Sequence, residues 1–374
     1  MNPARPLRLS ASPAPWSCAV PGSFAQRTLA VRVPKIFEDT IEANGDRFSD
    51  DVRSACFALY AELTQGRLRG LVEDAADRVA WDAACAPHIG KRWLELPWYF
   101  AESYFYRRVL EATAYFSQGT PDPFLVLKQE EERAMLPRVL SARRTNDLEE
   151  LVCLALWGNR VDLSYTAGRA FGALGDDDDL LVDQRSLALL RLAHAQRVAF
   201  VLDNAGTELA FDLLLAAQLT RCGKHVTLHA KAQPTFVSDA TIDDVKRTIA
   251  LLDLPEHFAM AAHAHWTSSA FHTRRDIPFD LASDLASADV VIIKGDANYR
   301  RLVGDAPWPH DTPVEEAMDF PAPLIALRTC KAEVAVGVSQ GIAARARARD
   351  AQWLVNGRLG MIQVAGAPLK ANGP

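Results

Sequence analysis

Short runs of apolar residues alternate with amphipathic segments through the second half of the chain. The runs have the length and composition of buried strands and cover residues 198–202, 226–228, 290–293, 324–327 and 361–364. Residues 208–220, 243–252 and 279–286 lie between them and carry apolar side chains at helical spacing. This alternation is typical of βαβ units, so we expect an α/β fold with a Rossmann-like, mainly parallel sheet and helices on both faces.

The first half of the chain shows helical periodicity instead. Apolar residues recur every three or four positions over residues 36–44, 50–65, 71–84, 98–118 and 147–157. We therefore predict an N-terminal all-helical domain over residues 34–185, followed by an α/β domain over residues 186–374. Residues 1–33 contain several prolines and no unbroken apolar run, and we interpret them as a flexible leader.

Composition narrows the class of protein. The chain has 374 residues, of which 49% are hydrophobic and 24% charged, as in ordinary globular proteins. The net charge of -6 argues against a nucleic-acid binder, and no run approaches the roughly 20 apolar residues of a membrane span. The six cysteines are scattered without a CxxC pair, which favours reduced thiols in a cytoplasmic protein.

Four polar motifs follow the strand-like runs. They cover residues 203–208, 236–239, 294–300 and 328–331. Because ligands bind beyond the carboxyl ends of the strands in an open parallel sheet, four such segments can meet at one site. Their side chains include the hard oxygen ligands Asp203, Asn204, Asp239 and Asp296 and the fixed cations Lys294, Arg300, Arg328 and Lys331. This mixture suits a divalent metal together with a phosphorylated substrate.

Each motif alone has a simpler interpretation. Asp203 or Asn204 could cap the helix that follows, and Ser238 and Asp239 are also good cap residues. The basic motifs could be salt-bridged turns. Cys330 has no partnered histidine in the sequence, so we interpret it as a small buried residue rather than a nucleophile. The occurrence of four motifs at four strand ends is what favours a site.

Taken together, the motifs resemble those of the damage-control phosphatase family. The resemblance is greatest to the subgroup with an Arg-Thr-x-Lys signature, which also contains acidic-residue (protein-glutamate O-) methyltransferase-like proteins. It rests on residues 98–108, 156–164, 203–208, 236–239, 294–300 and 328–331. It implies a helical N-terminal part and a Rossmann-like part. It also implies metal-dependent hydrolysis of sugar phosphates such as fructose 1-phosphate or fructose 6-phosphate, or of related damaged metabolites.

The resemblance also implies which residues form the site. Asp203, Asn204 and Asp239 would hold the divalent metal, with Mn²⁺ or Ni²⁺ favoured over Co²⁺ or Mg²⁺. These three residues and Lys331 form the predicted catalytic set. The predicted substrate-binding residues are Glu102, Lys294, Asp296, Asn298, Tyr299, Arg300, Arg328 and Lys331. Glu102, Asn159 and Asp162 belong to the matched helical motifs and could either reach sugar hydroxyls or pair with neighbouring arginines.

The predicted reaction is metal-assisted hydrolysis of a phosphomonoester, with a small phosphorylated metabolite as partner. A divalent cation would polarise the phosphoryl group, and Lys331, with Lys294 or Arg300, would neutralise charge on its oxygens. The nucleophile could be a metal-bound water or an aspartate carboxylate. Two alternatives stay open. One is methyl transfer from S-adenosylmethionine to protein carboxylates, which the lack of a glycine-rich loop after the first strand disfavours; the other is a non-catalytic sugar-phosphate sensor.

Overall fold

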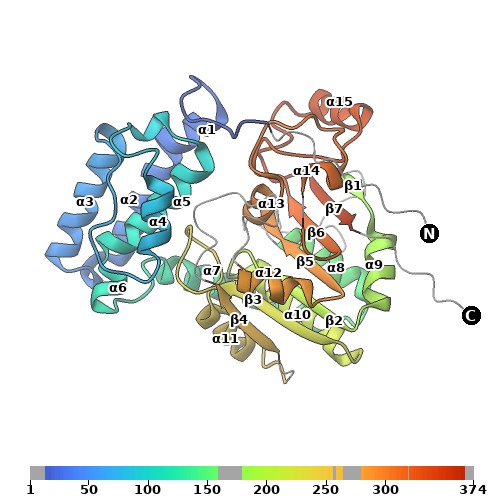
Figure 1. Ribbon diagram of the computed structural model, residues 1–374. Helices are drawn as coiled ribbons and strands as arrows, with labels where there is room; N and C mark the ends of the chain where they lie inside the picture. The colour runs from blue at the N-terminus through green and yellow to red at the C-terminus, as the bar shows by residue number, and fades with distance from the viewer. Residues whose placement is uncertain (1–12, 159–178, 256–257, 264–278, 319, 367–374) are drawn as a thin grey trace, which may run out of the picture.

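A seven-stranded sheet forms the centre of the molecule (Figure 1). The computed structural model describes residues 13–158, 179–255, 258–263, 279–318 and 320–366. Its strands are β1 (Leu180–Asp183), β2 (Arg197–Val201), β3 (His225–Lys231), β4 (Ala259–His263), β5 (Val290–Lys294), β6 (Leu324–Thr329) and β7 (Gly360–Ala365). They are arranged in the order β1-β7-β6-β5-β2-β3-β4.

The sheet is mainly parallel, as the sequence predicts. All neighbouring pairs are parallel except β6 and β7, which run antiparallel. From β2 the chain adds β3 and β4 on one side, and then crosses to add β5 and β6 on the other side. The carboxyl ends of β2 and β5 therefore flank the point where the strand order reverses, which is the usual place for a ligand in such a fold.

Helices cover both faces of the sheet, which confirms the α/β prediction. They are α8 (Leu148–Trp157), α9 (Arg185–His194), α10 (Thr207–Arg221), α11 (Ile242–Leu251), α12 (Phe279–Ala286), α13 (Gly295–Val303), α14 (Val314–Ala317) and α15 (Gln340–Arg349). The alternation of side chains along β2 separates the two layers. Val198 and Phe200 pack into a core with α8, α9, α10 and α11, whereas Ala199 and Val201 pack into a core with α12 and α13.

A separate helical layer stands beside the sheet, on the left of Figure 1. It contains α1 (Phe24–Arg27), a π-helical turn (Thr28–Arg32), α2 (Val33–Asn44), α3 (Asp50–Gln65), α4 (Arg78–Cys85), α5 (Trp98–Ala112) and α6 (Tyr115–Gln118). Short 3-10 turns cover Gly45–Arg47 and Trp93–Glu95. These helices enclose a core of their own that includes Trp81, Trp93 and Tyr104.

The described part of the expected leader is packed against this helical core. Ala25, Leu29 and Val33 recur at helical spacing and are buried, as is Cys18. The Trp16 amide donates to the Asp305 carbonyl at 3.0 Å, and the Trp98 amide donates to the Trp16 carbonyl at 2.8 Å. Trp16 also packs against both the helical core and a core of the α/β layer, so this part of the chain joins the two layers.

Two helices differ from the expected pattern. The helix expected over residues 98–118 is divided by Ala114, which adopts a left-handed backbone conformation with φ 56°. The second is α7 (Leu125–Ala142), over which the sequence pattern predicts no helix because the segment carries many charges and an internal Pro137. Both α7 and α8 pack against α10, so these elements of the predicted helical domain belong to the layer that covers the sheet.

Candidate metal and phosphate site

Asp203 lies at the centre of the candidate site, just beyond the end of β2. Its carboxylate is buried and accepts hydrogen bonds from the amides of Asn204 at 3.0 Å and Asn298 at 3.5 Å. Burial raises the pKa of Asp203, and the nearby carboxylates of Glu208 and Asp239 add to the rise. A carboxylate in these surroundings is stabilised in its charged form by a cation.

The turn between β5 and α13 approaches Asp203 as closely as a glycine allows. Gly295 has a φ of +78°, and a Cβ atom added there would lie 1.8 Å from Asp203 Oδ2. Glycine is the residue that accepts this backbone conformation without strain, and its lack of a Cβ atom leaves room for the Asp203 carboxylate itself. The close approach to Asp203 therefore explains why the middle residue of the Lys-Gly-Asp motif is a glycine.

The loop that follows β3 brings Asp239 next to Asn204. These two residues form an isolated antiparallel bridge, and the Ala240 amide donates to the Asp203 carbonyl at 2.7 Å. The Ser238 hydroxyl donates to Asn204 Oδ1 at 2.7 Å. The three residues predicted to bind metal, Asp203, Asn204 and Asp239, thus lie together at the switch point of the sheet.

Lys231, at the end of β3, is a site residue to which the sequence analysis gave no role. Its ammonium group is buried and lies 3.3 Å from Asp239 Oδ2. Burial lowers the pKa of Lys231, and the Asp239 carboxylate opposes this effect. Only its position shortly after the second apolar run, residues 226–228, could have indicated it.

The donor set fits a divalent cation bound through oxygen. Asp203 and Asp239 supply carboxylates, and Asn204 supplies an amide oxygen. Asp239 Oδ2 is buried and accepts no conventional hydrogen bond within the described residues, although the Lys231 ammonium group lies 3.3 Å from it. Across that same part of the chain, no three His, Cys, Asp or Glu side chains group around a metal position, so the amide of Asn204 would be needed. Metal binding by these residues stays a prediction.

Lys294 is fully buried behind the predicted metal ligands. Its ammonium group lies 3.2 Å from both Glu208 Oε1 and Asp212 Oδ1, and it donates to the Ala155 carbonyl. The second oxygen of Glu208 accepts a hydrogen bond from Asn204 Nδ2 at 2.9 Å. Lys294 therefore orients the Asn204 amide through Glu208, and Asp212, on the buried face of α10, balances its charge.

Asn298 and Arg301 of α13 continue this network. The Asn298 amide group donates to the Leu202 carbonyl at 3.0 Å and the Lys294 carbonyl at 2.8 Å, and its oxygen accepts from Arg301 at 2.7 Å. Arg301 is fully buried, with its guanidinium 5.4 Å from the centre of the Tyr99 ring. Its charge opposes the rise in the Asp203 pKa, although the sequence analysis gave Arg301 no role.

Arg328 is held by protein acceptors in the interior. Its guanidinium lies 2.8 Å from Asp296 Oδ1, donates to the carbonyls of residues 332 and 334, and stacks 4.3 Å over the Tyr299 ring. The Tyr299 hydroxyl donates to Gln363 at 2.9 Å. Asp296 Oδ1 also accepts the backbone amide of Lys331 at 3.0 Å. A phosphate contact from Arg328 would therefore replace one of these bonds, whereas Lys331 has a side chain that is only half-buried.

Arg300 joins the helical layer to the α/β layer. It pairs with Glu102 of α5 at 2.9 Å and with Asp305 at 2.7 Å, and it stacks on Trp98 and Tyr99 at 3.8 and 4.8 Å. Burial raises the pKa of Glu102, and the charge of Arg300 opposes the rise. Glu102 and Arg300, both predicted as substrate-binding residues, thus form a buried ion pair in this structure.

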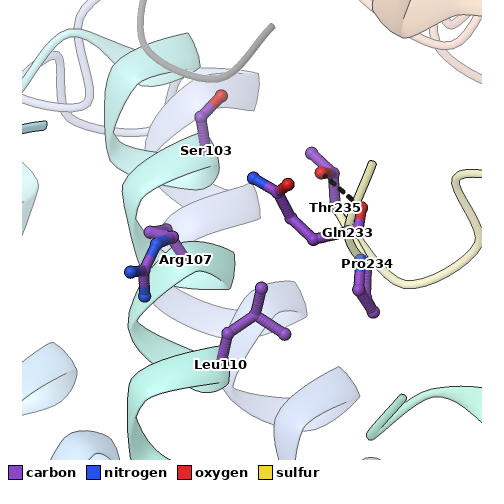
Figure 2. A pocket seen from close by; sticks show the side chains of 6 residues that line it. All are labelled: Ser103, Arg107, Leu110, Gln233, Pro234 and Thr235. Atoms are coloured by element: carbon purple, nitrogen blue, oxygen red, sulfur yellow. Dashed lines mark hydrogen bonds between the residues drawn. The ribbon is translucent and has the colours of Figure 1, made fainter. Parts of the chain in front are cut away.

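A small pocket borders this region between α5 and the segment that leads to Asp239 (Figure 2). Six side chains line it: Ser103, Arg107, Leu110, Gln233, Pro234 and Thr235. The Thr235 hydroxyl donates to the Gln233 carbonyl at 3.2 Å and so shapes the segment. None of the predicted site residues lines this pocket. Asn159 and Asp162 lie outside the described residues.

Fold and site together define a Rossmann-like α/β protein with an oxygen-donor cluster at the switch point of its sheet. The family model of the damage-control phosphatase ARMT1-like domain matches residues 28–345, so the chain belongs to this family. Among the helices that the structure describes, none has the length and apolar character needed to cross a membrane.

Individual relatives agree with this assignment. The chain is 29% identical to the damage-control phosphatase ARMT1 of Danio rerio, over 94% of this chain and 96% of that protein. It is also 29% identical to the Homo sapiens protein of the same name, over 92% and 97% of the two chains. A solved DUF89 family protein from Pyrococcus horikoshii has a similar fold, with a TM-score of 0.54, 17% identity and coverage of 91% and 99%.

Proposed function

We propose that the chain is a metal-dependent phosphatase that hydrolyses sugar phosphates or related damaged phosphometabolites. Membership of the damage-control phosphatase family supports phosphatase activity. The observation that carries the metal dependence is the cluster of Asp203, Asn204 and Asp239, in which both carboxylates are buried. Fructose 1-phosphate and fructose 6-phosphate are the proposed substrate type.

The residues of the chain prepare this site in two ways. Glu208 and Ser238 hold the Asn204 amide from its two ends, so that its oxygen keeps one orientation. The bond from the Ala240 amide to the Asp203 carbonyl fixes the loop that carries Asp239. When bound, a divalent cation would supply Lewis-acid activation of the phosphoryl group.

Lys331 is the proposed contact to the phosphoryl oxygens. Lys294, Arg300 and Arg328 are each buried against carboxylates, whereas the side chain of Lys331 is half-buried. Its backbone is fixed by Asp296, so the side chain extends from a rigid position. A lysine there would stabilise charge that develops on the transferred group.

Phosphate release from metal-stripped protein tests the proposal. Fructose 1-phosphate, fructose 6-phosphate and other sugar phosphates would be supplied with Mn²⁺, Ni²⁺, Co²⁺ or Mg²⁺, or with EDTA. We expect release that requires a metal and is abolished in Asp203→Ala and Asp239→Ala, while circular dichroism shows an intact fold. Equal activity in EDTA, or full activity in both folded variants, would refute the metal assignment.

A further inference from the structure

Lys128 of α7 connects the helical part of the chain to the predicted metal site. Lys128 is 3% exposed, and its ammonium group donates to Asp122 at 2.8 Å and to Asp244 at 2.8 Å. It also donates to the backbone carbonyl of Asp239 at 2.9 Å. The two carboxylates balance the charge of Lys128, so the carbonyl bond is an additional, directional contact to a predicted metal ligand.

A second residue of α7 touches the other metal loop. Glu131 lies one turn after Lys128, and its carboxylate accepts the backbone amide of Thr207 at 3.2 Å. A Cβ atom on Gly206 would lie 2.5 Å from this carboxylate. One face of α7 therefore contacts both the loop of Asp239 and the turn that follows Asp203 and Asn204.

Helix α7 lies where it can link the helical layer to the loop that carries Asp239. This helix packs against α2 of the helical layer and against α10 of the α/β layer. In Figure 1 it lies between the helical layer and the sheet. The Asp239 carbonyl and the Ala240 amide belong to one peptide group, and this amide donates to the Asp203 carbonyl. A peptide held on both sides in this way cannot rotate without breaking one bond.

We propose that Lys128 is a positioning residue, which fixes the peptide after Asp239 and makes the geometry of the metal site depend on the docking of α7. This inference rests on the proposed function for its metal-binding consequence. Residues that orient ligands typically change metal affinity by about 10–100-fold when they are replaced. Lys128 acts through the backbone, so its contribution to Asp239 is independent of the carboxylate's own pairing with Lys231.

The variant Lys128→Met removes the ammonium group and keeps the apolar stem. Asp244 retains Arg247 and Thr241 as partners, and Asp122 retains the Phe124 amide. Glu132→Gln is the matched control, because Glu132 pairs with Arg247 across the same α7–α11 contact without reaching Asp239. The double variant Lys128→Met/Asp122→Asn preserves net charge and serves if the single variant does not fold.

Two readouts decide the question. In metal-free protein, hydrogen exchange should accelerate in the peptide that contains the Ala240 amide for Lys128→Met but not for Glu132→Gln. In Mn²⁺ titrations, the Kd should rise at least about 10-fold for Lys128→Met alone. Exchange and Mn²⁺ affinity equal to those of Glu132→Gln would overturn the inference. If the parent protein binds no Mn²⁺, the proposed function fails, and the exchange experiment still decides whether Lys128 positions the loop.

Discussion

Replacement of Gly295 by alanine tests the geometry of the site most directly. The backbone there has a φ of +78°, which costs a residue with a Cβ roughly 1–2 kcal/mol. The added Cβ would lie 1.8 Å from Asp203 Oδ2, whereas ordinary contact begins at 3.4 Å. The carboxylate must therefore move by more than about 1 Å, a displacement that typically lowers catalytic efficiency by about 100-fold.

Gly223→Ala supplies the matched control for this prediction. Gly223 has a φ of +80°, a Cβ atom added to it would meet no other atom within 4 Å, and it precedes the amino-terminal end of β3, away from the strand ends that carry the site. Urea unfolding should show a similar strain cost in both variants, while sugar-phosphate hydrolysis and Mn²⁺ binding should fall only in Gly295→Ala. If Gly295→Ala keeps the kcat/KM of Gly223→Ala, Asp203 does not need its observed position.

Three further predictions follow from buried ionisable groups. Arg300→Met should lower the free energy of unfolding by about 3–5 kcal/mol, because it leaves two buried carboxylates without their counter-charge. The control Arg197→Met removes an exposed ion pair and should cost less than about 1 kcal/mol. Equal urea midpoints for the two variants would contradict this prediction. Burial opposes ionisation of Asp244, but Lys128 and other partners lower its pKa below the usual value. The ionised carboxylate therefore stabilises the folded protein fully above its unfolded pKa, and this contribution is lost as the pH falls through the lower folded pKa. Between pH 5 and pH 2.5 the urea midpoint should therefore fall less in Asp244→Asn than in the parent protein. Burial raises the pKa of the Cys330 thiol to about 11, so Cys330→Ala should keep phosphate release within a few-fold of the parent.

The fold could be predicted where burial leaves a periodic signal. The runs that became β2, β3, β5, β6 and β7 are rich in branched apolar residues, because central strands are covered on both faces. Strand β4 is an alanine-rich edge strand, and Met260 within it is 41% exposed, so its pattern is weak. Helix α7 combines many charges with Pro137, which removes a backbone donor, and local propensity therefore argues against a helix that tertiary contacts stabilise.

The sequence could predict only those site residues whose position follows from the end of a strand. Asp203 and Asp239 follow the adjacent strands β2 and β3, so the sheet alone brings them near each other. The partners of the cations could not be predicted in this way. Glu102 and Arg300 are separated by 198 positions, and Lys128 reaches Asp239 across 111 positions. Such pairs depend on how the helical layer docks against the sheet. Local sequence patterns contain no information about this docking.

The pairing of these cations bears on how a phosphorylated ligand could be held. Arg300, Arg328, Lys294 and Lys231 each lie within salt-bridge distance of a buried carboxylate. Their charge is therefore largely compensated before any ligand arrives, and the proposed contact from Lys331 alone would not balance the two charges of a buried phosphate dianion. A divalent cation held by Asp203, Asn204 and Asp239 would bring the two positive charges that the dianion needs. Metal and phosphate are thus expected to bind together, each making the site more favourable for the other.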